Sequence, residues 1–413
     1  MIINNFNKKS RIEIIRYNVR ELLNNTERDK SIVLFGGWFG QLFTDNARFL
    51  FQYLSNNKRE LNLNHVVWVT SNETLCSELK SMGYEAYDMY SSESVYFHKK
   101  AYYHIICNNS QFMGEKNTDL LVQYSNGAVK INLWHGLGGL KGVGYASRGY
   151  LAERSKHYLK CVIGEKLNYF KVYRQIIDMG GWRDCYYFST SMFSASIMQK
   201  YFNVPVTKIL ISSYPRTKQC LKFRSSEIEI LDRLKTRNNI ILYVPTFRES
   251  VISIEDPISS SKFVDFIEQN DITWISKKHS AEKSKSAVAR NSENIIILDD
   301  DFDINILYKS IDLLISDYSS AVWDALYYDL PVIFYAPDLK KYQFQDRGFL
   351  LKPAQFLIGK LTRNIDQLTE LLRKYNSQYK KLIPDNYPRL KKRMWGDEYT
   401  YKEIWNSIRN LHP

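Results

Sequence analysis

The chain has 413 residues and a formal net charge of +13, from 57 Lys and Arg against 44 Asp and Glu. Hydrophobic residues make up 44% and aromatic residues 14% of the sequence, which excludes an intrinsically disordered protein. No uninterrupted apolar stretch approaches the roughly 18 to 20 residues of a membrane-spanning helix. At about 100 to 200 residues per domain, the length predicts two globular domains.

Five cysteines, odd in number and widely spaced, favour neither a disulfide framework nor a zinc site, and they indicate a reducing compartment. The first residues lack the apolar segment of a secretory signal, so we expect a cytoplasmic protein. The positive charge indicates a polyanionic partner. Composition alone leaves open whether this is nucleic acid, an anionic membrane surface, a nucleotide or a phosphate-rich polymer.

Short β-branched or aromatic runs alternate with longer segments of helical period, which predicts parallel sheets covered by helices. In the first half of the chain, strands are expected at residues 31–37, 65–71, 85–90, 103–109 and 130–136. Helices are expected between them at residues 44–56, 73–82 and 92–101.

The same alternation returns in the second half, where strands are expected at residues 239–247, 272–279, 294–300, 312–320 and 331–337. Helices are expected at residues 260–269, 304–310 and 320–328. We therefore predict two Rossmann-like, doubly wound α/β domains that face a central cleft, with a ligand at the carboxyl ends of their strands. The predicted units are residues 1–215, residues 216–390 and a C-terminal helical segment, 391–413.

The C-terminal part of the chain is basic and rich in aromatic residues. Residues 371–413 carry ten Lys or Arg against four Asp or Glu, which is +6 of the total +13. Such a segment can lie on an anionic membrane surface, or it can form an amphipathic helix that packs on the protein. Both interpretations remain open, and both can hold together.

The segment INLWHGLGGLKGVG at 131–144 places His135 and Gly136 at the end of an expected strand, before a glycine-rich loop with Lys141. Catalytic groups gather at the carboxyl ends of strands in α/β proteins, and histidine takes up a proton near neutral pH. The spacing fits neither GxGxxG nor the Walker loop, although the glycines would still let backbone amides approach a phosphate. The alternative is a tight turn with a structural histidine.

A second histidine, His279, ends the strand expected at 272–279 and follows Lys277 and Lys278. If the two domains face each other, His135 and His279 meet in one cleft beside the lysine pair, an arrangement suited to phosphate groups. The alternative is a surface histidine in a solvated basic loop. The five other histidines lack a comparable context and are interpreted as structural.

The second half contains a buried strand, the sequence DYSS at 317–320 and then a helix that carries Asp324. Ser319 or Ser320 can cap this helix, and the free amides at its start suit a pyrophosphate. Asp324 lies four residues after Ser320 and so returns to the same face of the helix. The alternative is a well-capped core helix that binds no ligand.

Two further segments contain residues that suit phosphate or a metal ion. Thr246 and Arg248 follow the strand expected at 239–247 and can bind phosphate oxygens, the arginine through two parallel hydrogen bonds. The run DDDFD at 299–303 contains DxD triplets, but Asp303 directly precedes an expected helix and is interpreted as its cap. The sequence requires no cofactor, and a divalent cation is compatible with it.

Together these segments resemble the CDP-glycerol glycerophosphotransferase family, whose members build teichoic acids and related capsule polymers. The resemblance covers most of the chain and rests on FGGWFGQLFTDNARFLFQYL at 35–54, Trp-His-Gly at 134–136, Tyr-Pro-Arg at 214–216, the segment 243–248, and the block 303–349 with SDYSS, DLPVIFY and RGF. It implies a GT-B fold with two Rossmann-like domains, in which the C-terminal domain holds most of the nucleotide.

The resemblance also implies roles for individual residues. His135 would be the general base that deprotonates the acceptor hydroxyl, and His279 would contact the pyrophosphate and ease the departure of CMP. No metal ligand is predicted. The residues expected to bind the substrate or to organise its loops are Gly136, Lys141, Pro245, Thr246, Arg248, Lys277, Asp317, Ser319, Ser320, Asp324 and Arg347.

The expected reaction moves glycerol phosphate, or a related alditol phosphate, from CDP-glycerol or CDP-ribitol to a hydroxyl of a growing or lipid-linked polymer, and releases CMP. We expect a cytoplasmic enzyme that is peripheral on the inner face of the cell membrane, where an anionic surface is a partner. Nucleic acid is not expected, because no recognisable binding module is present. The alternatives are a GT-B glycosyltransferase with a nucleotide-sugar donor and a non-catalytic polyanion-binding protein.

Overall fold

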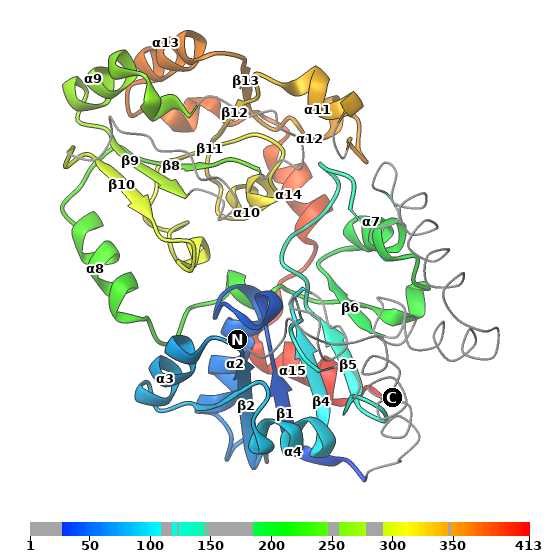
Figure 1. Cartoon of the computed structure of the whole chain (residues 1–413). Coiled ribbons are helices and arrows are strands. Elements are labelled where there is room, and N and C mark those ends of the chain that lie inside the picture. The colour runs from blue at the N-terminus through cyan, green and yellow to red at the C-terminus, as the bar shows by residue number, and fades with distance from the viewer. Residues whose placement is uncertain are drawn as a thin grey trace, which may run out of the picture.

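The computed structural model describes residues 27–108, 118–121, 124–143, 146, 185–246, 256–277, 292–345 and 348–413. Two parallel sheets, one from each half of the chain, dominate the fold (Figure 1). The α/β architecture with two Rossmann-like sheets is therefore confirmed. Within the described ranges, none of the helices has the length and apolar character needed to cross a membrane.

The first sheet has seven described strands in the order β3-β2-β1-β4-β5-β6-β7, and each neighbouring pair is parallel. Its strands are β1 (Asp29–Phe35), β2 (His65–Thr70), β3 (Glu85–Asp88), β4 (Ala101–Ile106), β5 (Val129–Asn132), β6 (Tyr186–Ser189) and β7 (Ile209–Ile211). The helices of this half are η1 (Trp38–Gly40), α2 (Asp45–Asn56), α3 (Glu73–Ser81), α4 (Ser92–Lys100), α7 (Met192–Phe202) and η6 (Val206–Lys208).

The second sheet has six described strands in the order β10-β9-β8-β11-β12-β13, again all parallel. Its strands are β8 (Ile240–Val244), β9 (Thr273–Lys277), β10 (Ile295–Leu298), β11 (Leu313–Ser316), β12 (Val332–Tyr335) and β13 (Lys360–Thr362). The helices from the connection onward are η7 (Pro215–Thr217), α8 (Ser225–Leu234), η8 (Pro257–Ser259), α9 (Ser261–Gln269), η10 (Ile304–Ile306), α10 (Ala321–Tyr327), α11 (Leu339–Gln345), α12 (Pro353–Phe356), α13 (Ile365–Tyr375), η11 (Tyr379–Leu382), α14 (Tyr387–Trp395) and α15 (Tyr401–Arg409).

Both sheets follow the Rossmann order, in which the direction of strand addition reverses once. The reversal lies between β1 and β4 in the first sheet and between β8 and β11 in the second. Ligands of open α/β sheets bind outside the carboxyl ends of the strands at such a switch point. The chain therefore has two candidate binding positions, one in each half.

Strand β1 shows why the strands appear in the sequence as continuous runs of apolar residues. Val33 and Phe35 belong to the large core that includes α2, while Ile32 and Leu34 pack with Phe97 of α4 on the other face. Strand β8 is likewise covered by α9 and α13 on one face and by α10 on the other. Because helices cover both faces, successive side chains are all buried, as expected of a doubly wound sheet.

Sequence patterning missed three short strands, did not predict helices α7, α8 and α13, and overestimated one helix. Strands β6 and β7 end the first sheet and β13 ends the second, and strands of three or four residues are too short to show a clear apolar pattern. The helix predicted at 304–310 is wrong, since only the 3-10 helix η10 forms there. A segment of this length with two β-branched isoleucines cannot offset the cost of nucleating an α-helix. Asp303 does cap it, as predicted, through a hydrogen bond to the backbone of Asn305.

The C-terminal part of the chain connects the two halves. Helix α13 packs on the second sheet, α14 contacts α10 and α7, and α15 lies beside the first sheet (Figure 1). Trp405 of α15 packs edge-on against Tyr103 of β4 with ring centroids 5.1 Å apart, and Tyr401 stacks on Tyr53 at 4.7 Å. These aromatic side chains of α15 thus pack on the first half of the chain. The boundary predicted after residue 215 falls within η7, between the two sheets.

A buried histidine stabilises the first half of the chain in its neutral form. His98 of α4 is fully buried, its Nδ1 lies 2.8 Å from the Ser94 carbonyl oxygen, and its Nε2 accepts a hydrogen bond from the Leu121 amide at 3.1 Å. A carbonyl can only accept, so the proton sits on Nδ1, and protonating Nε2 would break the bond to Leu121. Burial, with a smaller contribution from the charge of Arg28, lowers the pKa of His98 to about 4.

We expect the protein to lose stability in mild acid because of His98. Its pKa is lower in the folded than in the unfolded chain, so the stabilisation is complete above about pH 6.5 and is lost as the pH falls towards 4. The loss from this residue approaches about 3 kcal/mol. Urea unfolding at several pH values should show this slope, and His98→Gln should reduce it; the buried His104, whose pKa burial also lowers, adds to the slope in both proteins. An unchanged slope in that variant would contradict the assignment.

Candidate active site

His135 follows a sharp turn after strand β5. Trp134 has a positive φ of 55°, a left-handed conformation that is uncommon for a bulky residue. Two asparagines hold this turn: Asn132 Oδ1 accepts from the Trp134 amide at 2.9 Å, and Asn46 Nδ2 donates to the Trp134 carbonyl at 2.7 Å. Asn46 lies in the first turn of α2, so this helix fixes the position from which the His135 side chain projects.

The environment of the His135 ring determines which nitrogen can act as a base. Nδ1 lies 3.1 Å from the carbonyl oxygen of Cys107. Because that oxygen only accepts, Nδ1 carries the proton in the neutral ring and Nε2 carries the lone pair. Trp134 and Trp38 pack around the ring with centroids 4.1 and 4.9 Å away. A neutral imidazole held in one tautomer is suited to take a proton from a hydroxyl.

His135 lies at the switch point of the first sheet. Cys107 directly follows β4, and Trp38 follows β1 after two glycines, so the ends of these two strands both contact the ring. Trp38 and the next residue, Phe39, both have positive φ values, 44° and 59°. Backbone strain of this kind concentrates at functional sites. The position predicted for a catalytic histidine is therefore one where ligands of this fold bind.

The glycine-rich loop after His135 packs against the second half of the chain. A Cβ on Gly136 would lie 2.3 Å from Ser320 Oγ, so only glycine allows this approach. Lys141 forms a β-bridge with Phe349, and the Gly142 amide donates to the Gly348 carbonyl at 2.9 Å. The loop thus brings the residue after His135 directly onto the serine pair of the second half.

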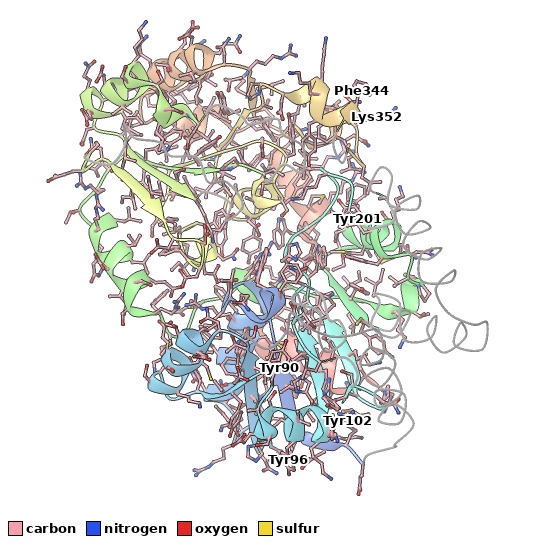
Figure 2. The ribbon with its side chains drawn as sticks, in the orientation of Figure 1. Tyr90, Tyr96, Tyr102, Tyr201, Phe344 and Lys352 are labelled. Atoms are coloured by element: carbon pink, nitrogen blue, oxygen red, sulfur yellow. The ribbon has the colours of Figure 1, made fainter. Side chains whose placement is uncertain are left out.

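Tyr201 of α7 holds the same loop from the first half (Figure 2). Its buried hydroxyl accepts a hydrogen bond from the Gly139 amide at 2.6 Å and donates one to the Lys141 carbonyl at 2.5 Å. The amides of Gly139 and Gly142 therefore bind protein acceptors. In this structure these glycines serve close packing rather than a phosphate cradle.

A second cluster lies at the switch point between β8 and β11. Asp317, directly after β11, accepts hydrogen bonds from the amides of Thr246 at 2.8 Å and of Tyr318 at 2.5 Å. It therefore connects the ends of both strands. Ser320 occupies the N-cap position of α10 without a capping bond, and Ser319 Oγ instead accepts from the Ala321 amide at 3.3 Å.

Lys277 ends strand β9 and points towards the acidic loop that precedes η10. Its ammonium group donates a hydrogen bond to the Phe302 carbonyl oxygen. Burial lowers the pKa of Lys277, and the nearby charges of Asp303 and Asp300 oppose this effect. Within the part of the chain that the structure describes, no group of three or more His, Cys, Asp or Glu side chains is arranged to hold a metal ion.

A buried ion network joins the two halves beside this site. Arg216 of η7 donates to Asp45 Oδ1 at 2.6 Å and to both carboxylate oxygens of Asp324 at 2.8 and 3.1 Å. All three side chains are at least nine-tenths buried. The charge of Arg216 lowers the pKa of Asp45, but burial outweighs it and raises that pKa to about 6. Asp324, predicted as a residue of the substrate loop, thus contacts the connection between the domains.

The network continues along α2. Arg48 makes two hydrogen bonds to the buried carboxylate of Glu227 in α8, at 2.5 and 2.7 Å, and also approaches Asp303 at 3.5 Å. Asp303 in turn accepts a hydrogen bond from the Asp45 amide at 3.0 Å. Because α2 also holds the turn before His135, the same helix sets the position of the histidine and of the second half.

The structure brings together some of the residues that the sequence predicts for the site. His135, Gly136 and Ser320 are brought together from opposite halves, and Asp317 and Thr246 meet at the second switch point. Pro245 lies beside Thr246 at the end of β8. His279, Arg248 and Arg347 lie outside the described residues. Sequence analysis did not identify the contact of Trp38 with His135 or the ion pairs of Arg216, since ring contacts and long-range ion pairs leave no local pattern.

The comparisons with known proteins agree with the motif resemblance. The family model CDP-Glycerol:Poly(glycerophosphate) glycerophosphotransferase matches residues 19–394. The chain belongs to this family. The resemblance predicted from the motifs is thereby confirmed, and the protein is a transferase of the glycerophosphotransferase family.

Relatives of known role span most of this glycerophosphotransferase-family chain. It is 25% identical over 378 residues to the teichoic acid glycerol-phosphate transferase of Staphylococcus aureus, which covers 88% of this chain and 89% of the relative. It is 22% identical over 359 residues to the teichoic acid poly(glycerol phosphate) polymerase of Bacillus spizizenii, covering 84% of each. The solved wall teichoic acid polymerase TagF superposes with a TM-score of 0.67 at 19% identity, over 96% of this chain and 93% of that one, which shows a shared fold.

We expect Arg216→Gln to be strongly destabilising. The substitution leaves the carboxylates of Asp45 and Asp324 buried without their cation, a change that typically costs about 3 to 5 kcal/mol. Urea unfolding at neutral pH measures it. The control is Lys402→Gln, which removes an exposed pair with Glu60 and should change the free energy of unfolding by less than about 0.5 kcal/mol. Equal effects of the two substitutions would contradict this role of Arg216.

Proposed function

We propose that the protein transfers glycerol phosphate, or a related alditol phosphate, from a CDP-linked donor to a hydroxyl of a growing or lipid-linked polymer. The observation that carries this proposal is the placement of His135 at the switch point of the first sheet, with its Nε2 as the proton acceptor. The next residue, Gly136, packs against the serine loop of the other half. Membership of the family and its named teichoic acid relatives support this donor and acceptor.

In the proposed mechanism, His135 Nε2 takes the proton of the acceptor hydroxyl. The hydroxyl oxygen forms a bond to the β-phosphorus of the donor, the bond from that phosphorus to the CMP oxygen breaks, and CMP leaves with the electron pair. The proton on His135 then passes to solvent. In such a reaction most of the acceleration comes from positioning and from stabilisation of charge on the phosphoryl oxygens.

The second half is proposed to hold the donor. Thr246, Ser319 and Ser320 lie at its switch point, where hydroxyl and amide donors can bind phosphate oxygens. The pyrophosphate is proposed to contact His279, Arg248 and Arg347. Positive charge near it would come from Lys141 and Lys277. The loops are proposed to be shaped by Pro245, Asp317 and Asp324. The predicted division into residues 1–215, 216–390 and 391–413 is kept as part of this proposal.

We expect His135→Ala to abolish transfer while the fold stays intact, because the variant lacks the proposed acceptor of the hydroxyl proton. Release of CMP from CDP-glycerol, with a teichoic-type acceptor, measures turnover, and circular dichroism checks the fold. The matched control is His65→Ala, a histidine at the start of β2 that pairs with Glu85. Turnover close to normal in His135→Ala would contradict the assignment of His135 as the general base.

The choice of donor separates the proposal from its alternatives. A panel of CDP-glycerol, CDP-ribitol and nucleotide sugars should yield CMP release with a CDP-alditol only. Release of UDP or GDP from a sugar donor would favour a GT-B glycosyltransferase. Polymer binding that survives His135→Ala, without turnover of any donor, would favour a polyanion-binding protein.

We also propose that the enzyme works in the cytoplasm, bound peripherally to the anionic inner face of the cell membrane. The tail aromatics Tyr387, Trp395 and Trp405 are buried in the protein, whereas tail lysines such as Lys380 and Lys381 are exposed. Membrane attraction through the tail would therefore be electrostatic rather than by insertion of aromatic rings, and it would weaken with added salt.

Replacing Lys374, Lys380 and Lys381 by Gln should reduce binding to anionic vesicles more than turnover on a soluble acceptor. Each lysine near such a surface contributes about 1 kcal/mol. Vesicle co-sedimentation at low and at physiological salt measures the effect. The control with the same charge change replaces the exposed Lys235, Lys262 and Lys309. Equal loss of binding and turnover in the tail variant would count against this division of roles.

A further inference from the structure

The buried carboxylate of Asp119 has no part in the mechanism so far. It is fully buried and accepts three hydrogen bonds from backbone amides. Phe39 donates to Oδ1 at 2.6 Å, and Cys107 and Asn108 donate to Oδ2 at 3.1 and 2.7 Å. These amides follow strands β1 and β4, so Asp119 binds the ends of both strands at the first switch point.

One peptide group connects Asp119 to His135. The N–H of Asn108 donates to Asp119 Oδ2, and the carbonyl of the same peptide group, on Cys107, accepts from His135 Nδ1. The hydrogen bonds thus run in one direction, from the imidazole through the peptide to the carboxylate. In a dry site, each bond of such a chain polarises and strengthens the next.

We propose that Asp119 is a positioning residue that acts on His135 through this peptide group, fixing the Nδ1–H tautomer and increasing the proton affinity of Nε2. The inference rests on the proposed role of His135 as the base. The carboxylate pulls the peptide N–H, which increases the negative charge on the Cys107 oxygen. That oxygen then holds the Nδ1–H more strongly and stabilises the imidazolium that forms during transfer.

Asp119 also supports the segment that carries the Trp38 ring, which packs against His135. Its bond to the Phe39 amide braces the left-handed turn at Trp38 and Phe39, which places the Trp38 ring against His135. A Cβ on Gly36 would lie 1.9 Å from the Asp119 carbonyl oxygen, so the end of β1 rests directly on this backbone. One carboxylate therefore fixes both the hydrogen-bond acceptor of His135 and its aromatic neighbour.

The Cys107 thiol and the carboxylates of Asp45 and Asp303 also lie near this relay. Burial raises the pKa of the Cys107 thiol well above its usual value, so the thiol stays neutral at the pH of an assay. Asp45 and Asp303, which also act on Cys107, are paired with Arg216 and Arg48. Backbone amides donate the hydrogen bonds of Asp119 described here, and the Asn108 amide belongs to the same peptide group as the acceptor of His135 Nδ1.

The wild-type protein allows a direct test by nitrogen NMR. With ¹⁵N-labelled histidine, assigned by comparison with His135→Gln, neutral His135 should show a protonated Nδ1 and an unprotonated Nε2. The Asn108 amide proton should shift with the same midpoint as His135 titrates. The opposite tautomer, or an Asn108 amide that does not respond, would overturn the proposal without any variant at Asp119.

The variant Asp119→Asn keeps the size of the side chain and removes its charge. We expect the midpoint of His135 to fall by about one pH unit, kcat to fall about 10- to 100-fold, and KM for CDP-glycerol to change less than about twofold. The acid limb of the pH profile of kcat should move to lower pH. The control Thr118→Val, which removes a neighbouring buried hydroxyl that donates to the Leu120 carbonyl, should leave that limb in place.

A folded Asp119→Asn variant with an unchanged His135 midpoint and unchanged kcat would overturn the proposal. If Asp119→Asn does not fold, the tautomer and the Asn108 titration in the wild type decide. Failure of the proposed function can be distinguished from failure of this inference. The first would appear as normal turnover in His135→Ala. The second would appear in the NMR titration, which measures the coupling of Asp119 to His135 in the resting enzyme.

Discussion

The buried ion pairs of Arg216 are the interaction on which the rest of the structure depends. This arginine of the connecting segment binds Asp45, at the start of α2, and Asp324, in α10 of the other half. Charges removed from water are stable only when paired and hydrogen-bonded, so the two halves are constrained to one arrangement around it. Asn46, the residue after Asp45, holds the turn before His135, and Asp324 lies one turn after the serine pair. The network thus positions both sides of the site.

The site combines the switch points of two Rossmann-type sheets. In the first, His135 is surrounded by the ends of β1 and β4 and by two tryptophans. In the second, Asp317 connects the ends of β8 and β11. The glycine loop connects the two switch points. A side chain at residue 136 would collide with Ser320, so Gly136 allows the two segments to approach each other closely. The proposed base on one sheet and the proposed donor loop on the other suit the transfer of a group between two substrates.

The strands of both sheets and the position of His135 were predictable, because the sequence patterns that reveal them are local. Strands buried on both faces appear as apolar runs, and His135 stands out because it ends one of them before a glycine loop. The short edge strands and the 3-10 helix η10 were misjudged because a few residues carry too little pattern to outweigh tertiary contacts. Trp38 and Arg216 contact residues about 100 to 170 positions away along the chain, and no periodicity reveals such pairs.

The sequence by itself determined the fold class, the family and the place of His135 at a strand end, since these follow from apolar periodicity and short motifs. Only the tertiary structure decided which nitrogen of His135 carries the proton, and that Asp324 binds Arg216. It also decided that Tyr387, Trp395 and Trp405 of the basic tail are buried while Lys380 and Lys381 are exposed. The physical reason is that hydrogen-bond direction, burial and ion pairing depend on groups brought together from distant parts of the chain, and these meet only when the chain is folded.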